Sequence, residues 1–159
     1  MSSKGGEKMK PVWYTDGACS KNGFTGATGG FGVVCVDEDT DTIIYQHQEF
    51  HPDTTNNRME MKAILHALIQ AGVLHLPGAP IIRSDSAYAV NTFTSWMYKW
   101  AANDWKRPGN KTPENLDLVK DFYYLQEAGA TCVLEHIKGH AGNKWNEYVD
   151  DLATGRRKI

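Results

Sequence analysis

The first part of the chain alternates between apolar and polar residues, which is the pattern of β-strands with one buried face. Residues 12–18 alternate so that Val12, Tyr14 and Asp16 share one face, and the apolar run at 29–36 predicts a second strand. An acidic turn at 37–41 leads into a third strand at 42–48. So short a connection predicts a hairpin, and we expect the first three strands to pair antiparallel.

A helical period follows at 57–71, where apolar residues recur every three or four positions. Small residues form a second stripe beside the apolar one, at Ala63, Ala67 and Ala71. Glu60 lies three residues before Ala63 and therefore belongs to this stripe. Because small residues allow close packing, we expect the stripe to face the sheet, and Glu60 to point toward the sheet rather than into water.

The rest of the chain begins with an apolar strand at 79–84, which ends immediately before Asp85. Later elements are helices at 86–94, 96–102 and 115–128, a strand at 131–137, a glycine-rich loop at 139–143 and a helix at 144–154. This order predicts an α/β fold with a five-stranded mixed sheet flanked by helices. Ligands of such sheets collect at the carboxyl ends of strands, which is where Asp85 lies.

The composition is that of one globular domain, with 159 residues of which 41% are hydrophobic and 23% are charged. We expect a disordered tail at 1–11, a domain at 12–155 and a C-terminal tail at 156–159. No apolar run approaches the ~20 residues of a membrane span, and no signal sequence opens the chain. The three cysteines lack the spacing of a zinc site or a disulfide framework. We therefore expect a cytoplasmic protein that does not associate with membranes and is a monomer.

Charge is a weaker guide, because a net charge of −2 does not mark a nucleic-acid-binding protein. Between residues 96 and 111, however, basic side chains are interleaved with tryptophans. The basic residues are Lys99, Lys106, Arg107 and Lys111, and the tryptophans are Trp96, Trp100 and Trp105. Such a segment is either a solvated face or a binding surface. The tryptophans favour a binding surface, although for Trp100 we expect helix packing.

Four carboxylates in separate short motifs are the strongest candidates for chemistry: Asp16, Glu60, Asp85 and Asp150. The first three occupy positions that face the interior or a cleft, where an ionised carboxylate is costly without a cation. Several carboxylates at one place repel one another, and a divalent metal ion relieves that repulsion. Taken singly, Asp16 could be a turn residue and Asp85 a helix N-cap. Taken together, the carboxylates predict a metal site.

Five ordered motifs between Val12 and Gly155 resemble the cellular type 1 ribonuclease H family. They are Thr15-Asp16-Gly17, Thr55-Asn56-Asn57-Arg58-Met59-Glu60, Ser84-Asp85-Ser86, Lys138-Gly139-His140-Ala141-Gly142 and Asn146-Glu147 with Asp150. The resemblance implies the ribonuclease H-like fold and an endonuclease that cleaves the RNA strand of an RNA·DNA hybrid, leaving 5′-phosphate and 3′-hydroxyl ends. It also implies a two-metal-ion mechanism in which the four carboxylates bind Mg²⁺, with Mn²⁺ as a substitute. The second ion is expected to bind together with the substrate.

The same resemblance assigns roles to residues outside the carboxylate set. His140, in the glycine-rich loop, matches a histidine that orients the water or assists product release, and an ordinary pKa of ~6.5 suits proton transfer. The implied contacts to the RNA strand are Cys19, Asn22, Asn56 and Asn57. The implied contacts to the DNA strand are Thr55 and Asn115 at a phosphate, and Tyr88 and Trp96 at deoxyribose. Amide side chains suit the RNA side because they can both donate to and accept from a 2′-hydroxyl.

The chain departs from the family pattern at Asp53, Ala87 and Glu114, where relatives often carry side chains that reach the hybrid. Each change removes or reverses a phosphate contact, so we expect weaker hybrid binding with a shallower salt dependence.

Three other functions are alternatives to a stand-alone ribonuclease H. They are another nuclease or strand transferase of the same fold, such as an integrase-like core, a ribonuclease H domain of a reverse transcriptase, and a non-catalytic hybrid-binding module. A non-catalytic module would usually have lost a carboxylate, whereas here all four are present.

Overall fold

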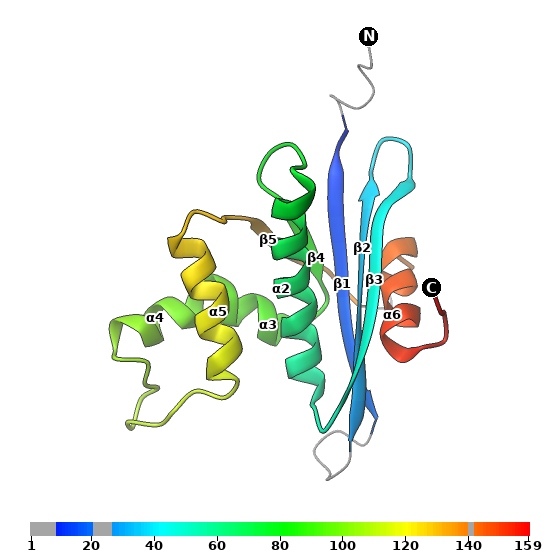
Figure 1. Cartoon of the computed structure of the whole chain (residues 1–159). Coiled ribbons are helices and arrows are strands. Elements are labelled where there is room, and N and C mark those ends of the chain that lie inside the picture. Colours follow the sequence, from blue (N-terminus) through cyan, green and yellow to red (C-terminus); the bar gives the residue numbers. More distant parts are fainter. Residues whose placement is uncertain (1–8, 21–26, 140–141) are drawn as a thin grey trace.

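The computed structural model describes residues 9–20, 27–139 and 142–159, which fold around one mixed sheet (Figure 1). The strands are β1 (Pro11–Ser20), β2 (Thr28–Asp37), β3 (Thr42–Pro52), β4 (Ile81–Ser84) and β5 (Val133–His136), in the spatial order β3-β2-β1-β4-β5. β2 pairs antiparallel with β1 and with β3, whereas β4 runs parallel to both β1 and β5. The predicted α/β fold, with its antiparallel beginning, is confirmed.

Helices cover both faces of this sheet. They are α2 (Asn56–Leu74), α3 (Ala87–Asn91), α4 (Met97–Ala102), α5 (Leu116–Glu127) and α6 (Lys144–Thr154). Figure 1 shows α2 against one face of the sheet and α6 against the other, with α4 and α5 on the far side of α2 from β1. The order of elements is the one that the sequence predicts.

Strict alternation along β1 divides the core into two layers. Trp13 packs under α2, in the larger cluster of buried side chains. Val12 and Tyr14 pack on the opposite face, against Trp145 and Val149 of α6. Because successive side chains of a strand point to opposite faces, both layers follow from the alternation in the sequence.

The helical segment at 87–102 differs in detail from the two helices expected there. α3 continues into α4 through a π-helical turn, η1 (Thr92–Trp96). In this stretch, Thr92 Oγ1 donates to the carbonyl of Tyr88 at 2.7 Å, and Thr94 Oγ1 donates to that of Val90 at 2.6 Å. Threonine hydroxyls that bond the preceding turn often bend helices, which accounts for an interrupted but continuous helical run.

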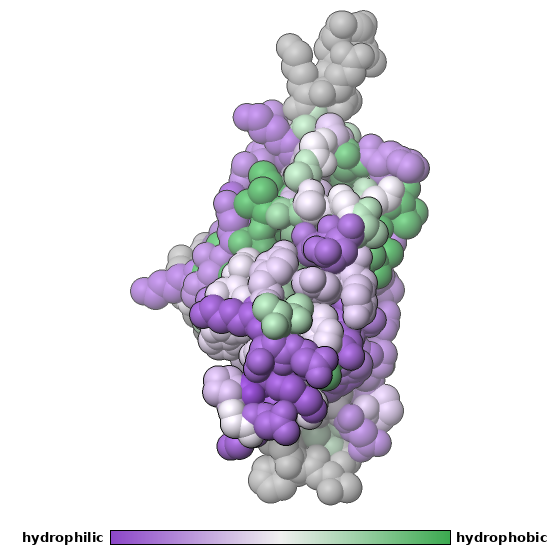
Figure 2. All heavy atoms as spheres, turned by 90° about the vertical axis from the view of Figure 1, so that its left-hand side faces the viewer, coloured by the Kyte–Doolittle hydropathy of each residue, from purple (hydrophilic) through white to green (hydrophobic). Residues whose placement is uncertain are grey.

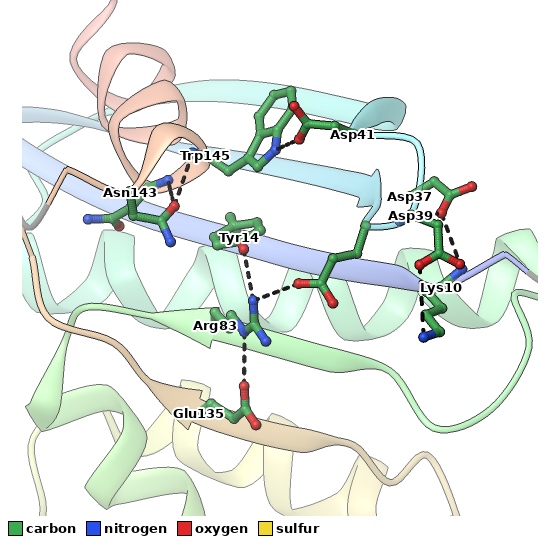
Figure 3. Close-up of polar contacts among 11 residues, drawn as sticks. Lys10, Tyr14, Asp37, Asp39, Asp41, Arg83, Glu135, Asn143 and Trp145 are labelled. Atoms are coloured by element: carbon green, nitrogen blue, oxygen red, sulfur yellow. Dashed lines mark hydrogen bonds and ion pairs between the residues drawn. The ribbon is translucent and has the colours of Figure 1, made fainter.

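Arg83 of β4 ties the sheet to the tip of the β2–β3 hairpin (Figure 3). Its guanidinium donates to Tyr14 Oη and Glu135 Oε1, both at 2.9 Å, and to Glu38 Oε2 at 3.2 Å. The three acceptors lie on β1, on β5 and in the hairpin turn. One partly buried arginine therefore links three separate parts of the chain.

A second set of contacts fixes the start of α6 (Figure 3). Asn143 Oδ1 caps the helix by accepting from the backbone N–H groups of Trp145 and Asn146, at 3.0 and 2.9 Å. Asp41, in the hairpin turn, accepts from the indole N–H of Trp145 and from Lys144 Nζ, each at 2.7 Å. The acidic turn seen in the sequence is therefore an anchor for α6.

The two predicted tails are described to different extents. The disordered tail expected at 1–11 lies mostly outside the described residues, and β1 already begins at Pro11. The C-terminal residues fold back, since the N–H of Arg157 donates to the carbonyl of Asp151 and that of Ile159 to Gln48 Oε1. Among the described helices, none combines the length and apolar character needed to cross a membrane.

Candidate active site

The sheet register brings two of the carboxylates together. In the parallel pair of β1 and β4, Thr15 lies opposite Ser84, so Asp16 and Asp85, the next residue of each segment, lie side by side where β4 ends. Asp16 itself remains within β1, opposite Gly32 of β2. Asp85 follows the last residue of β4, as the sequence predicts. Parallel strands collect their carboxyl ends at one edge of a sheet, and this is the usual position of a ligand site.

Gly17 brings the third carboxylate, Glu60, to the same place. The N–H of Gly17 donates to Asp16 Oδ1 at 2.9 Å and to Glu60 Oε1 at 2.8 Å. The start of α2 lies so close to β1 that a Cβ on Gly17 would stand 2.3 Å from the backbone nitrogen of Glu60. Only glycine permits this approach, so the glycine next to Asp16 sets the position of Glu60.

Asp16, Glu60 and Asp85 together form a cluster of oxygen ligands. Each offers a carboxylate oxygen, and the three oxygens lie within 4.8 Å of one another. The N-cap of α3 is Ser86, whose Oγ accepts from the N–H of Ala89 at 3.1 Å. The alternative that Asp85 is the helix cap is therefore wrong.

Burial and mutual repulsion hold protons on this cluster. Burial and the neighbouring charge of Asp85 raise the pKa of Asp16 to about 8. Burial, together with the charges of Asp16 and Asp85, raises the pKa of Glu60 well above its ordinary value. Both effects disfavour the ionised carboxylates, and a bound cation would reverse them. The donor set consists of oxygens, which hard divalent ions prefer.

Asp150 lies beside the cluster but is turned to another partner. Its charge also raises the pKa of Asp16, so the two carboxylates are near each other. Asp150 Oδ2 is paired with the guanidinium of Arg156, whose Nε also donates to Asp151 Oδ1 at 2.9 Å. Arg156 was not predicted from the sequence, because residues 156–159 have the composition of a tail and no local pattern marks this pair.

Two of the predicted site residues, Asn22 and His140, lie outside the described residues. The loop that carries His140 starts at the cluster, because a Cβ on Gly139 would stand 3.0 Å from Asp85 Oδ2. Among the residues predicted to contact the RNA strand, Cys19 donates its thiol to the carbonyl of Thr54 at 3.4 Å. Asn56 and Asn57 form the exposed first turn of α2, one turn from Glu60.

A polar network joins the residues expected at a DNA phosphate. Thr55 caps α2, and its Oγ1 accepts from the N–H of Arg58 at 3.1 Å. Asn115 donates to Tyr88 Oη at 3.2 Å and accepts from Arg58 Nη1 at 3.3 Å. Arg58 also forms a two-point ion pair with Asp117, in which Nη1 donates to Oδ1 at 3.0 Å and Nη2 donates to Oδ2 at 2.8 Å. Neither Arg58 nor Asp117 was predicted to have a role, although Arg58 lies inside the motif at 55–60.

An aromatic and basic groove of about 600 Å³ adjoins this network. Its lining includes Tyr88, Trp96, Trp100, Lys99, Lys106, Arg107 and Glu114. Trp96 remains partly exposed, whereas Trp100 also packs against the core, as expected. Figure 2 views the side of the molecule that carries α4 and α5, where hydrophilic residues dominate the lower half and the more hydrophobic ones gather in the upper half. Trp96, Trp100, Lys99, Lys106 and Arg107 of the interleaved segment therefore line one groove, while Trp105 and Lys111 are not part of its lining. That the groove binds nucleic acid stays a prediction.

Comparisons with known proteins agree with this geometry. The family model described as RNase H matches residues 8–158. A ribonuclease H of Jannaschia sp. (strain CCS1) is 42% identical over 146 residues, covering 89% of this chain and 87% of that protein. A ribonuclease H of Thermoanaerobacter pseudethanolicus is 38% identical over 147 residues, covering 91% of this chain and 88% of that protein.

Solved structures show the same fold. The type 1 RNase H called LC9-RNase H1 is 30% identical, with a TM-score of 0.77 and coverage of 91% of this chain and 70% of that chain. LC11-RNase H1, solved in complex with an RNA/DNA hybrid, has a TM-score of 0.67 at 21% identity, covering 92% of this chain and 95% of that chain. At that identity the second likeness concerns the fold alone.

Proposed function

This chain belongs to the ribonuclease H family, and on that premise we propose that Asp16, Glu60, Asp85 and Asp150 bind the metal ions of its reaction. The chain is a ribonuclease H that hydrolyses the RNA strand of RNA·DNA hybrids and depends on a divalent metal ion. Membership in this family argues against the integrase-like and non-catalytic alternatives. The observation that carries the proposal is the convergence of three carboxylate oxygens within 4.8 Å.

The residues present fit Mg²⁺, with Mn²⁺ as a substitute of similar ligand preference. Asp16, Glu60 and Asp85 offer oxygens alone, and their mutual repulsion is the kind that a cation relieves. Asp150 would become the fourth ligand if its carboxylate released the guanidinium of Arg156 and bound a metal ion instead. We propose two ions, the second held partly by the scissile phosphate. When bound, they would supply an activated water and charge stabilisation at the leaving 3′-oxygen.

The chain's own residues would position the substrate around this centre. The P–O3′ bond of the RNA breaks and a water oxygen bonds to phosphorus, which leaves 5′-phosphate and 3′-hydroxyl ends. We assign Asn22, Asn56, Asn57 and the segment at Cys19 to the RNA 2′-hydroxyls, and His140 to orienting the water or releasing the product. We assign Thr55 and Asn115 to a DNA phosphate, and Tyr88 and Trp96 to deoxyribose. The Tyr88 and Trp96 rings already meet edge to face, with centroids 6.1 Å apart.

The test of the function is cleavage of end-labelled duplexes, each incubated with Mg²⁺, with Mn²⁺ or with EDTA. The substrates are RNA·DNA hybrid, RNA·RNA, DNA·DNA and single-stranded RNA. We expect metal-dependent cutting of the hybrid's RNA strand only. Binding of the hybrid without cutting in either metal would contradict the proposal. The expected monomeric state and cytoplasmic location stay predictions, to be checked by light scattering and by cell fractionation.

Replacing Asp117 by asparagine is expected to strengthen hybrid binding and steepen its salt dependence. Asp117 is largely exposed and occupies the guanidinium of Arg58 beside Thr55 and Asn115, where the DNA phosphate is proposed to bind. Losing the carboxylate leaves Arg58 free to bind that phosphate. The plot of log K against log salt concentration, whose slope is negative, should then become steeper by about 0.9. Because exposed ion pairs contribute little, the free energy of unfolding should change by less than about 1 kcal/mol.

The matched control is Asp121→Asn, which removes the same charge one turn further along α5. Hybrid binding is measured by fluorescence anisotropy in EDTA at several salt concentrations. Equal slopes for the two variants would show that general charge, rather than the release of Arg58, controls binding.

A further inference from the structure

Three histidines and a glutamate gather on the α2 side of the edge strand β3. His47, Glu49 and His51 alternate along β3 and so point to the same face, and His66 of α2 meets them there. Beneath them lies Phe31, whose ring centroid is 5.9, 6.1 and 5.8 Å from those of His47, His51 and His66. No sequence motif gives these histidines a role, and none of them belongs to the active-site carboxylate cluster.

The polar atoms of this group already converge. Glu49 bridges two histidines, with Oε1 at 2.9 Å from His47 Nε2 and Oε2 at 2.6 Å from His51 Nε2. The rings of His47 and His66 stack with centroids 4.1 Å apart and planes 8° apart. His47, Glu49 and His66 each offer a ligand atom, and these atoms lie within 4.8 Å of one another.

The chemistry of these donors differs from that of the active site. Two imidazoles and one carboxylate suit Zn²⁺ and related transition-metal ions, whereas Mg²⁺ prefers oxygens alone. Side chains of His47 and Glu49 are partly exposed, at 32% and 41%, so an ion can reach them from solvent. Nε2 of His66 is hydrogen-bonded to Tyr45 Oη at 2.6 Å, so binding an ion through Nε2 replaces this contact.

We propose that His47, Glu49 and His66 form a second metal site, which takes a borderline divalent transition-metal ion such as Zn²⁺. The ion replaces the proton between His47 and Glu49, and the ring of His66 turns out of its stack to direct a nitrogen lone pair at it. His51 holds the second carboxylate oxygen of Glu49 and so orients that ligand. Such an ion links β3, an edge strand, to α2. It is therefore a structural cross-link that stabilises the fold.

The test is calorimetric titration of the full chain with ZnCl₂ in excess Mg²⁺, which occupies the carboxylate cluster. We expect one zinc ion per chain, and an affinity at least about tenfold lower in His66→Ala and in His47→Gln. His47→Gln serves as the second variant because it retains a hydrogen-bonding group on a partly exposed strand. The control is His75→Asn, which removes an exposed histidine at the C-cap of α2, where asparagine tolerates the φ of 52°.

Thermal unfolding supplies a readout that is independent of cleavage. Ligand binding to the folded state raises stability with zinc concentration, so the melting temperature should rise in the wild type and in His75→Asn and much less in the two site variants. Asp16→Asn should bind zinc as the wild type does. Equal zinc affinity in the wild type and His47→Gln would overturn the proposal, as would loss of the zinc ion in Asp16→Asn.

Discussion

Asp16→Asn is expected to abolish cleavage and, at the same time, to stabilise the metal-free protein. Asp16 is a buried residue, with 5% of its surface exposed, and it is a proposed metal ligand. Loss of a ligand removes several kcal/mol of transition-state stabilisation, so kcat should fall by about a thousandfold or more. Asparagine cannot ionise, so the variant avoids the cost of a charged carboxylate at this buried position, and its advantage in free energy of unfolding grows as the pH rises.

The pH dependence distinguishes this stabilisation from a general effect. The pKa of Asp16 is about 8 in the folded protein against 3.8 for an ordinary aspartate, so the folded state binds more protons between these values. Stability from this group is therefore fully present below about pH 4 and is lost as the pH rises toward 8. The wild type and Asp16→Asn should differ little in free energy of unfolding at acid pH. As the pH rises, Asp16→Asn should become progressively more stable than the wild type.

Urea unfolding in EDTA at a series of pH values measures this divergence. Asp121→Asn, on the exposed face of α5, is the control and should follow the wild type throughout. Single-turnover cleavage with saturating enzyme measures the chemical step. A variant that cleaves normally, or that loses stability in parallel with the wild type as pH rises, would contradict the assignment of Asp16.

Gly17→Ala is expected to cause the largest combined loss of stability and activity. The added Cβ would stand 2.3 Å from the nitrogen of Glu60 and 2.5 Å from the carbonyl carbon of Met59, and both are backbone atoms. Neither can rotate away, so the start of α2 must move off β1. We expect a loss of about 3 kcal/mol in the free energy of unfolding. Displacing Glu60 by even an ångström should lower kcat roughly a hundredfold.

The matched control lies in the same helix. Gly72, near the end of α2, has no atom within 4 Å of an added Cβ. Gly72→Ala should therefore raise stability by roughly 0.5–1 kcal/mol, because alanine loses less backbone entropy in a helix, and it should leave kcat unchanged. Urea unfolding and steady-state kinetics of the two variants provide the comparison. Similar behaviour of both would show that the contact between β1 and α2 is looser than the structure indicates.

Local pattern was sufficient for much of the fold. The alternation at 12–18 and 29–36, the acidic turn and the helical period at 57–71 predicted the hairpin, the sheet flanked by helices and the direction of Glu60. These features depend on side-chain spacing of two or about 3.6 residues, which any short segment displays by itself. The motifs around Asp16, Glu60, Asp85 and Asp150 added the family, because their order and spacing are specific to it.

Contacts between distant segments were decided only in the tertiary structure. That Asp16 meets Asp85 depends on β4 lying beside β1 in parallel, and the periodicity of a single segment does not encode which strands become neighbours. Other contacts between separate segments were likewise not predictable from local pattern. They are the pairs Arg58 with Asp117 and Asp150 with Arg156, and the packing of His66 against β3. The sequence by itself determined which residue types were available for chemistry. The packing of β1, β4 and α2 determined which carboxylates lie close enough together to bind one ion. Burial and strand pairing bring together segments that are distant in the sequence.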